Sequence, residues 1–251
     1  MDALDYTAIA HEGLAFMNPL ADEDVDEMIE ALELEPGAHA LDLGCGKAEV
    51  LIRVVERYPD VRAVGLDRSP DIIAEARRQA ETRVPEARVT LLEEDVRDYA
   101  PEPGAFDLVV STGGVSFRGG VGGTLAVLSG FVAPGGKLLF GEGFWREEPT
   151  AEYLVALGAA REELRDYEGT IEAAADVGLR LLRAVTSSIE DWDRYEDAWA
   201  ENGARWAAAH PDDPGVDDFR AWIAAGQERY RELGGRDILG FGLFLFQRGA
   251  L

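Results

Sequence analysis

The chain has 251 residues, enough for one large α/β domain, and 47% of them are hydrophobic, which predicts a packed protein. A formal net charge of −25 repels phosphate backbones and anionic lipids, so we expect neither nucleic acid nor membranes as partners. No apolar run reaches the ~20 residues that cross a bilayer. The acidic first residues lack the basic segment of a signal peptide, so a cytoplasmic protein is expected.

Cysteine and histidine are scarce. Cys45 is the single cysteine, which excludes an intramolecular disulfide and a cysteine-based metal cluster. The histidines His11, His39 and His210 are far apart and do not have the HExxH spacing of a zinc site. We therefore predict no metal.

Strands and helices alternate over the first half of the chain. Helical spacing of apolar residues predicts a helix from Ala21 to Leu34, and Ser69-Pro70 is a typical helix start. Short apolar runs, separated by helical patterns and glycine turns, predict five strands at 40–43, 61–66, 88–92, 106–111 and 137–140. This alternation predicts a parallel sheet with helices on both faces, whose ligands bind beyond the carboxyl ends of the strands.

The second half departs from simple repetition. Residues 150–177 are mostly helical in pattern, 179–185 predict a sixth strand, and 241–246 predict a last, buried strand. The polar, tryptophan-rich stretch between those strands is too long for a hairpin, so we expect a helical lid, broken near 211–215. The predicted organisation is a cap segment at 1–20, a core formed by 21–188 and 240–251, and an inserted lid at 189–239.

The strongest signal lies at the end of the first predicted strand, in residues 41–49 (LDLGCGKAE). Gly44 and Gly46 let the backbone turn sharply and approach a ligand without interference from a Cβ atom. The helix after the turn presents free N–H groups and the positive end of its dipole to that ligand. A plain glycine turn between a strand and a helix is the alternative interpretation.

Two nucleotide-binding interpretations of this turn differ in the residues expected after Gly46. The nicotinamide fingerprint G-x-G-x-x-G needs its third glycine at Glu49, where a carboxylate would repel a pyrophosphate. The other pattern is an acidic residue followed by G-x-G-x-G, with Asp42 as the acid and Ala48 in place of the third glycine. Acidic residues at these positions disfavour a ligand that presents a phosphate to the turn, so the second pattern is favoured.

Polar residues come directly after the next three strands. Asp67, with Arg68 next to it, ends the second strand, where a carboxylate can accept hydrogen bonds from two ribose hydroxyls. After the third strand, Asp95 can accept an adenine amino proton while the backbone N–H of Val96 donates to a ring nitrogen. Ser111 ends the fourth strand, where backbone carbonyls can meet an ammonium. Any one of these is also explained as a solvated strand end, but their order and spacing together indicate a nucleoside.

Residues 22–145 therefore resemble the class I S-adenosylmethionine-dependent methyltransferases that act on small molecules. The turn at 134–136 (PGG) is similar to that family's entry into its fifth strand. The resemblance implies a Rossmann-like α/β fold with a seven-stranded, mostly parallel sheet in the order 3-2-1-4-5-7-6 and an antiparallel seventh strand. It also implies S-adenosyl-L-methionine as the cofactor, bound by Asp42, Gly44, Cys45, Gly46, Asp67, Arg68, Asp95, Val96 and Ser111.

The candidate catalytic residues are His11, in the N-terminal segment, and Glu142, beyond the fifth strand. A base is needed only if the acceptor's nucleophile arrives protonated. His11 is either that base or a packing histidine. The family resemblance puts Glu142 at the edge of the sheet that faces the reaction centre.

Candidate substrate contacts are all aromatic: Phe16, Trp145, Tyr195 and Trp199. Trp145 either orients a substrate or packs beneath the lid. Tyr195 and Trp199 belong to an aromatic stripe on one helical face, which either covers an apolar acceptor or forms a core.

We therefore expect an enzyme that transfers a methyl group from S-adenosyl-L-methionine to an oxygen or nitrogen of a small molecule. The acidic chain favours a neutral or cationic acceptor. Two alternatives stay open: a non-catalytic protein that binds S-adenosylmethionine, and a nicotinamide-dependent oxidoreductase. The sequence does not identify the acceptor, and whether the chain forms a homodimer is left open.

Overall fold

The structure is a computed structural model that describes residues 3–250. Met1, Asp2 and Leu251, at the ends of the predicted cap and core, lie outside the described residues. In chain order the elements are α1 (Ala3–Ala10), α2 (Asp22–Glu30), β1 (His39–Leu43), α3 (Glu49–Arg57), β2 (Arg62–Asp67), α4 (Pro70–Arg83), the 3₁₀ turn η1 (Glu86–Arg88), β3 (Val89–Glu93), β4 (Phe106–Thr112), α5 (Gly120–Phe131), β5 (Val132–Trp145), α6 (Ala151–Leu157), the 3₁₀ turn η2 (Arg161–Glu163), α7 (Tyr167–Asp176), β6 (Leu179–Thr186), α8 (Ile189–Ala209), α9 (Val216–Arg231), α10 (Gly235–Ile238) and β7 (Leu239–Arg248).

The strands of the described chain form one sheet in the order β3-β2-β1-β4-β5-β7-β6. Strands β1 to β5 pair in parallel, and β7 runs antiparallel to both β5 and β6. The predicted sheet, its strand order and the direction of its last strand are confirmed. The order reverses between β1 and β4, and the carboxyl ends of these strands flank the point where such sheets bind ligands.

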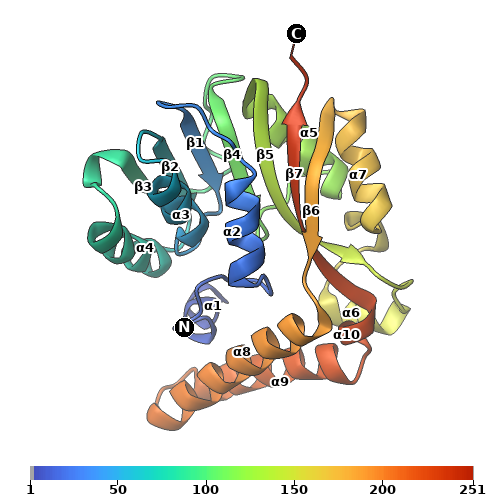
Figure 1. Cartoon of the computed structure of the whole chain (residues 1–251). Helices are drawn as coiled ribbons and strands as arrows, with labels where there is room; N and C mark the ends of the chain where they lie inside the picture. The colour runs from blue at the N-terminus through green and yellow to red at the C-terminus, as the bar shows by residue number, and fades with distance from the viewer. Residues whose placement is uncertain (1–2, 251) are drawn as a thin grey trace.

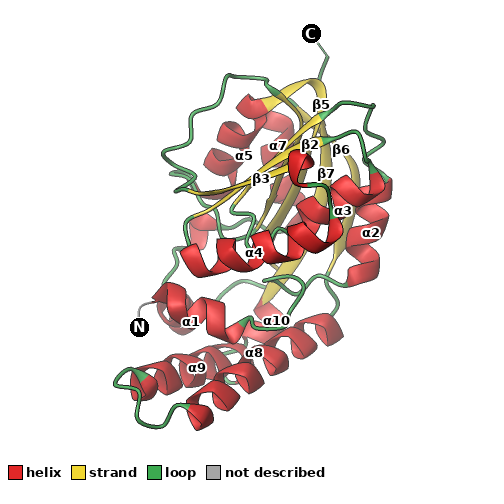
Figure 2. Ribbon diagram, turned by 90° about the vertical axis from the view of Figure 1, so that its left-hand side faces the viewer, coloured by secondary structure: helices red, strands yellow, loops and turns green. Residues whose placement is uncertain are grey.

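Helices cover both faces of the sheet, and a further group lies at its carboxyl edge (Figure 1). On one face lie α2, α3 and α4; on the other lie α5 and α7. The long helices α8 and α9 run side by side below the edge of the sheet, with α1 next to them in both views (Figure 2). Tyr6 of α1 packs on Phe219 and Trp222 of α9, with ring centroids 5.0 and 5.6 Å apart.

Alternation along the buried strands builds the two halves of the core. Leu108 and Val110 of β4 face the layer of α2, α3 and α4, while Val109 between them faces α5 and α7. Because successive side chains of a strand point to opposite faces, a strand buried on both sides is a continuous apolar run. The last strand has the same design, with Leu243 and Leu245 on one side and Phe244 and Phe246 on the other.

Two elements differ from the predictions. The fifth strand, expected at 137–140, extends from Val132 to Trp145, because β7 pairs with it as far as Trp145 opposite Leu239. The predicted turn at 134–136 is an irregularity within this strand, where the register with β4 shifts. The predicted cap segment contains the helix α1, which the sequence did not predict because its apolar residues do not gather on one helical face.

No helix of residues 3–250 is both long and apolar enough to cross a membrane.

Candidate active site

The glycine turn after β1 adopts a conformation that favours glycine. Gly44 and Gly46 have φ values of +71° and +54°, and a Cβ atom on Gly44 would lie 2.5 Å from Cγ2 of Val115. Ala48 also has a positive φ, +59°, which explains why related motifs place a third glycine there. The N–H of Cys45 donates to the carbonyl of Leu66 (2.8 Å), which fixes the turn against β2.

Asp67, at the end of β2, is fixed by two backbone donors. Its carboxylate accepts hydrogen bonds from the N–H of Gly46 (3.1 Å) and from the N–H of Ser69 (2.9 Å). Ser69 also caps α4, because its hydroxyl accepts from the N–H of Ile72, as the sequence predicted. The carboxylate is thus held beside the glycine turn with lone pairs left for a ligand.

Asp95 lies in the segment after β3. Its carboxylate accepts hydrogen bonds from the backbone N–H and the guanidinium of Arg97, which hold the pKa of Asp95 well below its usual range. Asp95 and Val96 line one small cavity together with Arg97 and Asp67.

Two adjoining cavities of about 260 Å³ each lie along the carboxyl ends of β1, β2 and β3. They share Gly44, Asp67, Arg68 and Gly114. The first also has Cys45 and Gly46 in its wall, and the second has Asp95 and Val96. Together they form an elongated site, which we call the cofactor cavity, with Asp67 near its middle.

Asp42 is fully buried beneath the glycine turn. Its Oδ1 atom has no hydrogen-bond partner among residues 3–250, and burial, together with repulsion from Asp67, raises the pKa of Asp42 to about 8. Two carboxyl groups that repel each other favour a cation nearby and disfavour a phosphate. Ser111, also buried, lies on β4 beneath the same edge.

A further cavity of about 290 Å³, which we call the acceptor cavity, lies beyond the carboxyl ends of β4 and β5. Glu142 of β5 lines it, together with Tyr195 and Glu196 of α8 and Arg229 of α9. Residues from the loop after β4 and from the N-terminal segment separate it from the cofactor cavity. Both cavities are lined by Met17, Asn18, Gly113, Gly114 and Tyr195.

Known proteins are similar to this chain in sequence and in fold. Residues 40–136 match a family model described as a methyltransferase domain. The chain is 30% identical over 229 residues to the uncharacterized protein YjhP of Escherichia coli K12, which covers 90% of this chain and 91% of that protein. A methyltransferase from Thiobacillus denitrificans, crystallised with S-adenosyl-L-homocysteine, superimposes with a TM-score of 0.86 at 29% identity, covering 98% and 99% of the chains.

The chain belongs to the class I S-adenosylmethionine-dependent methyltransferases. It is also 28% identical over 217 residues to the trans-aconitate 2-methyltransferase of Paracidovorax citrulli, covering 81% of each protein. The methyltransferase uses S-adenosyl-L-methionine, and its site fits that cofactor. The backbone at Gly44 leaves no room for a side chain, and Oδ1 of the buried Asp42 has no hydrogen-bond partner among residues 3–250.

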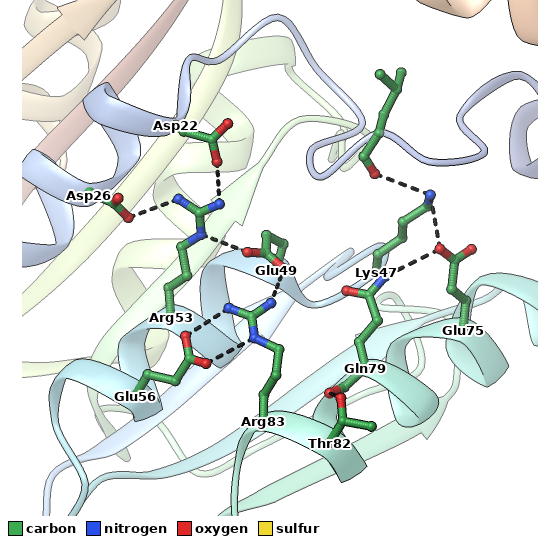
Figure 3. Close-up of polar contacts among 11 residues, drawn as sticks. Asp22, Asp26, Lys47, Glu49, Arg53, Glu56, Glu75, Gln79, Thr82 and Arg83 are labelled. Carbon is green, nitrogen blue, oxygen red and sulfur yellow. Dashed lines mark hydrogen bonds and ion pairs between the residues drawn. The ribbon is translucent and has the colours of Figure 1, made fainter.

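Glu49 opposes an anionic cofactor less strongly than its position in the sequence predicts. Glu49 lines the cofactor cavity, but Arg53 (2.6 Å) and Arg83 (2.5 Å) both pair with its carboxylate (Figure 3). The charge of Glu49 is therefore largely balanced, and it repels an anion less than the sequence predicted. The acidic character of the site comes instead mainly from Asp67, because Asp42, with its pKa raised to about 8, is largely protonated near pH 7.

Lys47 anchors the N-terminal segment of the methyltransferase to the glycine turn. Its buried ammonium donates to the carbonyls of His11 (2.6 Å) and Leu14 (3.2 Å), and it pairs with Glu75 of α4 at 3.1 Å (Figure 3). Asn18 provides a second anchor, because its side-chain amide donates to the carbonyl of Thr112 at the end of β4 (2.9 Å). The segment therefore forms one wall of both cavities.

His11 is buried and contacts Tyr195 of α8. Its Nδ1 lies 2.7 Å from the carbonyl of Thr7 and its Nε2 lies 2.8 Å from the hydroxyl of Tyr195. Because a carbonyl can only accept, Nδ1 carries the proton and Nε2 accepts from Tyr195. Burial lowers the pKa of His11 to about 4, so the ring is neutral near pH 7.

The structure brings some predicted acceptor contacts together and leaves others apart. Tyr195 lines both cavities, and Phe16 lines the cofactor cavity with Arg53 stacked over its ring at 5.0 Å. Trp145 lies outside the cavities, packed on Tyr153, and its indole N–H donates to a backbone carbonyl. Trp199 packs between α8 and α9, on Trp222 and against Gly226.

Several residues of the site escaped the sequence analysis. Gly113 and Gly114, directly after β4, were readable as a second glycine turn at a strand end. Lys47 was also conspicuous, as one of only two lysines in the sequence. Glu196 and Arg229 had no local signal, because both belong to helices with many exposed charged residues.

Proposed function

We propose that the methyltransferase transfers its methyl group to an oxygen or nitrogen of a small, neutral or cationic molecule bound in the acceptor cavity. The observation that carries this proposal is the shared wall of the two cavities, formed by the N-terminal segment, Gly113, Gly114 and Tyr195. The acceptor cavity thereby adjoins the cavity that is proposed to hold the cofactor. The cavity volume of about 290 Å³ supports a small acceptor.

The cofactor supplies a methyl group that a sulfonium has already activated. The protein's contribution is therefore alignment and the exclusion of water. We propose that Gly44, Gly46 and Asp67 hold the ribose and methionine portions, and that Asp95 and Val96 hold the adenine. Cys45 and Arg68 complete the walls, and Asp42 and Ser111 support the turn from below.

Of the two predicted catalytic residues, Glu142 is the better proton acceptor. Burial raises the pKa of Glu142 to about 7, which suits a base that works near neutral pH, whereas His11 has a pKa of about 4. We propose that His11 instead positions the hydroxyl of Tyr195 between the two cavities. Helices α8 and α9, with α1, are proposed to act as the lid over the acceptor. Phe16 is proposed to close the cofactor cavity on one side.

Release of S-adenosylhomocysteine tests the proposal. The purified protein is incubated with S-adenosylmethionine and with pools of neutral, cationic or anionic metabolites. We expect product release with the neutral or cationic pools, reduced about tenfold or more in Asp67→Ala. Binding of the cofactor without release in any pool would favour the non-catalytic alternative.

A further inference from the structure

Glu142 is a carboxylate of the acceptor cavity without a counter-charge. Its Oε1 accepts from the N–H of Gly143 (2.9 Å), and no cation of residues 3–250 forms an ion pair with it. The pKa of Glu142 responds to burial and to that one hydrogen bond, and no neighbouring charge is among its causes. Its second oxygen, Oε2, accepts no hydrogen bond from residues 3–250.

The other ionised groups of the cavity balance one another. Burial raises the pKa of Glu196 to about 7, and the positive charge of Arg229 opposes that rise. The side-chain amide of Gln227 also donates to the Glu196 carboxylate (3.3 Å). Arg229 thus acts on the Glu196 carboxylate, whereas no charged group is among the causes that set the pKa of Glu142.

Tyr195 adds a second hydrogen-bond acceptor. Its hydroxyl lies 2.8 Å from Nε2 of His11 and 3.4 Å from the carbonyl of Met17, and both of these atoms accept. The single hydroxyl proton is therefore directed into the protein, and an oxygen lone pair is left for the cavity. An occupant that donates several hydrogen bonds and carries a positive charge satisfies both groups.

We infer that the acceptor is a small primary or secondary amine with an apolar body, bound as its ammonium ion between Glu142 and Tyr195. This inference rests on the proposed methyl transfer and deepens it. Trp192, Tyr230 and Phe241 also line the cavity and offer aromatic faces to the body, while the buried indole N–H of Trp192 has no partner among residues 3–250. Aromatic faces also attract cations. A polycarboxylate such as trans-aconitate would instead meet the unpaired charge of Glu142.

The proton balance of the reaction gives Glu142 its role. The ammonium transfers one proton to the Glu142 carboxylate, which frees the nitrogen lone pair. That pair forms the new N–C bond while the C–S bond breaks, and the electrons of the C–S bond stay on sulfur. The products are an N-methylammonium ion and a neutral thioether, and the proton on Glu142 passes to solvent.

Calorimetry with matched ligands tests this inference on the full-length protein. S-adenosylhomocysteine is titrated first, and its binding checks the proposed function independently. Benzylamine, benzyl alcohol, benzoate and trans-aconitate are then titrated into the saturated protein. We expect benzylamine to bind about tenfold or more tightly than the other three ligands. With S-adenosylmethionine, mass spectrometry should detect N-methylbenzylamine.

Two variants assign the effect to a residue. Glu142→Gln should weaken benzylamine about tenfold and leave benzyl alcohol and S-adenosylhomocysteine within about twofold. Glu147→Gln, which removes an exposed carboxylate just beyond β5, is the matched control and should change none of these affinities.

Three results would overturn the inference: benzoate or trans-aconitate binding as tightly as benzylamine, no binding of benzylamine to the saturated protein, or an unchanged benzylamine affinity in Glu142→Gln. The ligand comparison uses the wild-type protein, so it decides the matter even if the variant fails to fold. Failure of the proposed function gives a different result. The protein would then not bind S-adenosylhomocysteine, or would not release it from S-adenosylmethionine with any acceptor pool.

Discussion

The cofactor cavity and the acceptor cavity are neighbours that the chain builds in opposite ways. The cofactor cavity comes mainly from consecutive strand ends, so Gly44, Asp67 and Asp95 lie within about fifty residues of one another. The acceptor cavity joins the N-terminal segment, β5, α8 and α9, which are far apart in the sequence. Local backbone geometry therefore determines the first, and packing between distant helices determines the second.

Lys47 links these two regions, and removing it is expected to have the largest effect. Lys47→Met would leave two backbone carbonyls of the N-terminal segment and the carboxylate of Glu75 without their partner. We expect a loss of about 3 kcal/mol in the free energy of unfolding, measured by urea denaturation. Weaker binding of S-adenosylhomocysteine should accompany it, because the segment lines the cofactor cavity.

Lys137→Met is the matched control for this prediction, since Lys137 is the other lysine and its ammonium also donates to backbone carbonyls, those of Leu32 and Glu33. It should leave the affinity for S-adenosylhomocysteine unchanged. Equal loss of affinity in both variants would mean that the N-terminal segment is not a wall of the site.

Gly44→Val tests whether the local backbone geometry of the glycine turn determines cofactor binding. The β-branched side chain would have to adopt a φ of +71° and would overlap Val115. The affinity for S-adenosylhomocysteine should fall on the order of a hundredfold, measured by calorimetry. Gly130→Ala in α5, where an added Cβ meets open space, should change nothing, and a normal affinity in Gly44→Val would separate the turn from cofactor binding.

Asp42→Asn tests the buried acid beneath the turn through the pH dependence of stability. The pKa of Asp42 rises from 3.8 to about 8 on folding, so its protonated form favours the folded state. Ionisation of the buried Asp42 destabilises the folded state. This destabilisation is absent below pH 3.8, the pKa of the unfolded chain, grows as the pH rises, and is complete above about pH 8. Relative to wild type, the variant should therefore gain on the order of 2 kcal/mol between about pH 5 and about pH 8.

Thermal denaturation across this pH range, without cofactor, is the measurement. A stability difference between variant and wild type that stays constant with pH would show that Asp42 titrates normally.

Tyr195→Phe addresses the boundary between the two regions and is expected to have the smallest effect. The hydroxyl contributes one hydrogen bond to the acceptor, so we expect kcat/KM to fall about tenfold and the affinity for S-adenosylhomocysteine to stay within about twofold. Tyr99→Phe, on the opposite side of the sheet, is the control. If the affinity for S-adenosylhomocysteine fell as much as kcat/KM in Tyr195→Phe, Tyr195 would act in the cofactor cavity alone.

Much of the fold was predictable because short signals fixed it. The glycine turn, the cap at Ser69 and the alternating strands predicted a parallel sheet, and the family resemblance that they support implied its strand order and its cofactor. The extension of β5 to Trp145 was not predictable, because pairing with β7, which begins almost a hundred residues later, keeps it extended. Glu142 belongs to that extension, so its surroundings could not be predicted either.

The aromatic stripe of α8 illustrates the same limit. Its helical spacing predicted one face, and the face exists, but the partners divide it. Trp199 meets the rings of α9 and becomes core, whereas Tyr195 meets His11 and lines both cavities. Helical spacing carries no information on which residues of the aromatic stripe a distant segment will cover.

The sequence by itself determined the fold class and the methyltransferase family, because positive φ angles and strand-end carboxylates are properties of a few adjacent residues. The tertiary structure alone decided which charges are paired: Glu49 forms ion pairs with two arginines, Arg229 acts on Glu196, and Glu142 forms no ion pair with the described residues. Charge balance depends on distances between side chains from separate elements, and those distances exist only after the helices pack.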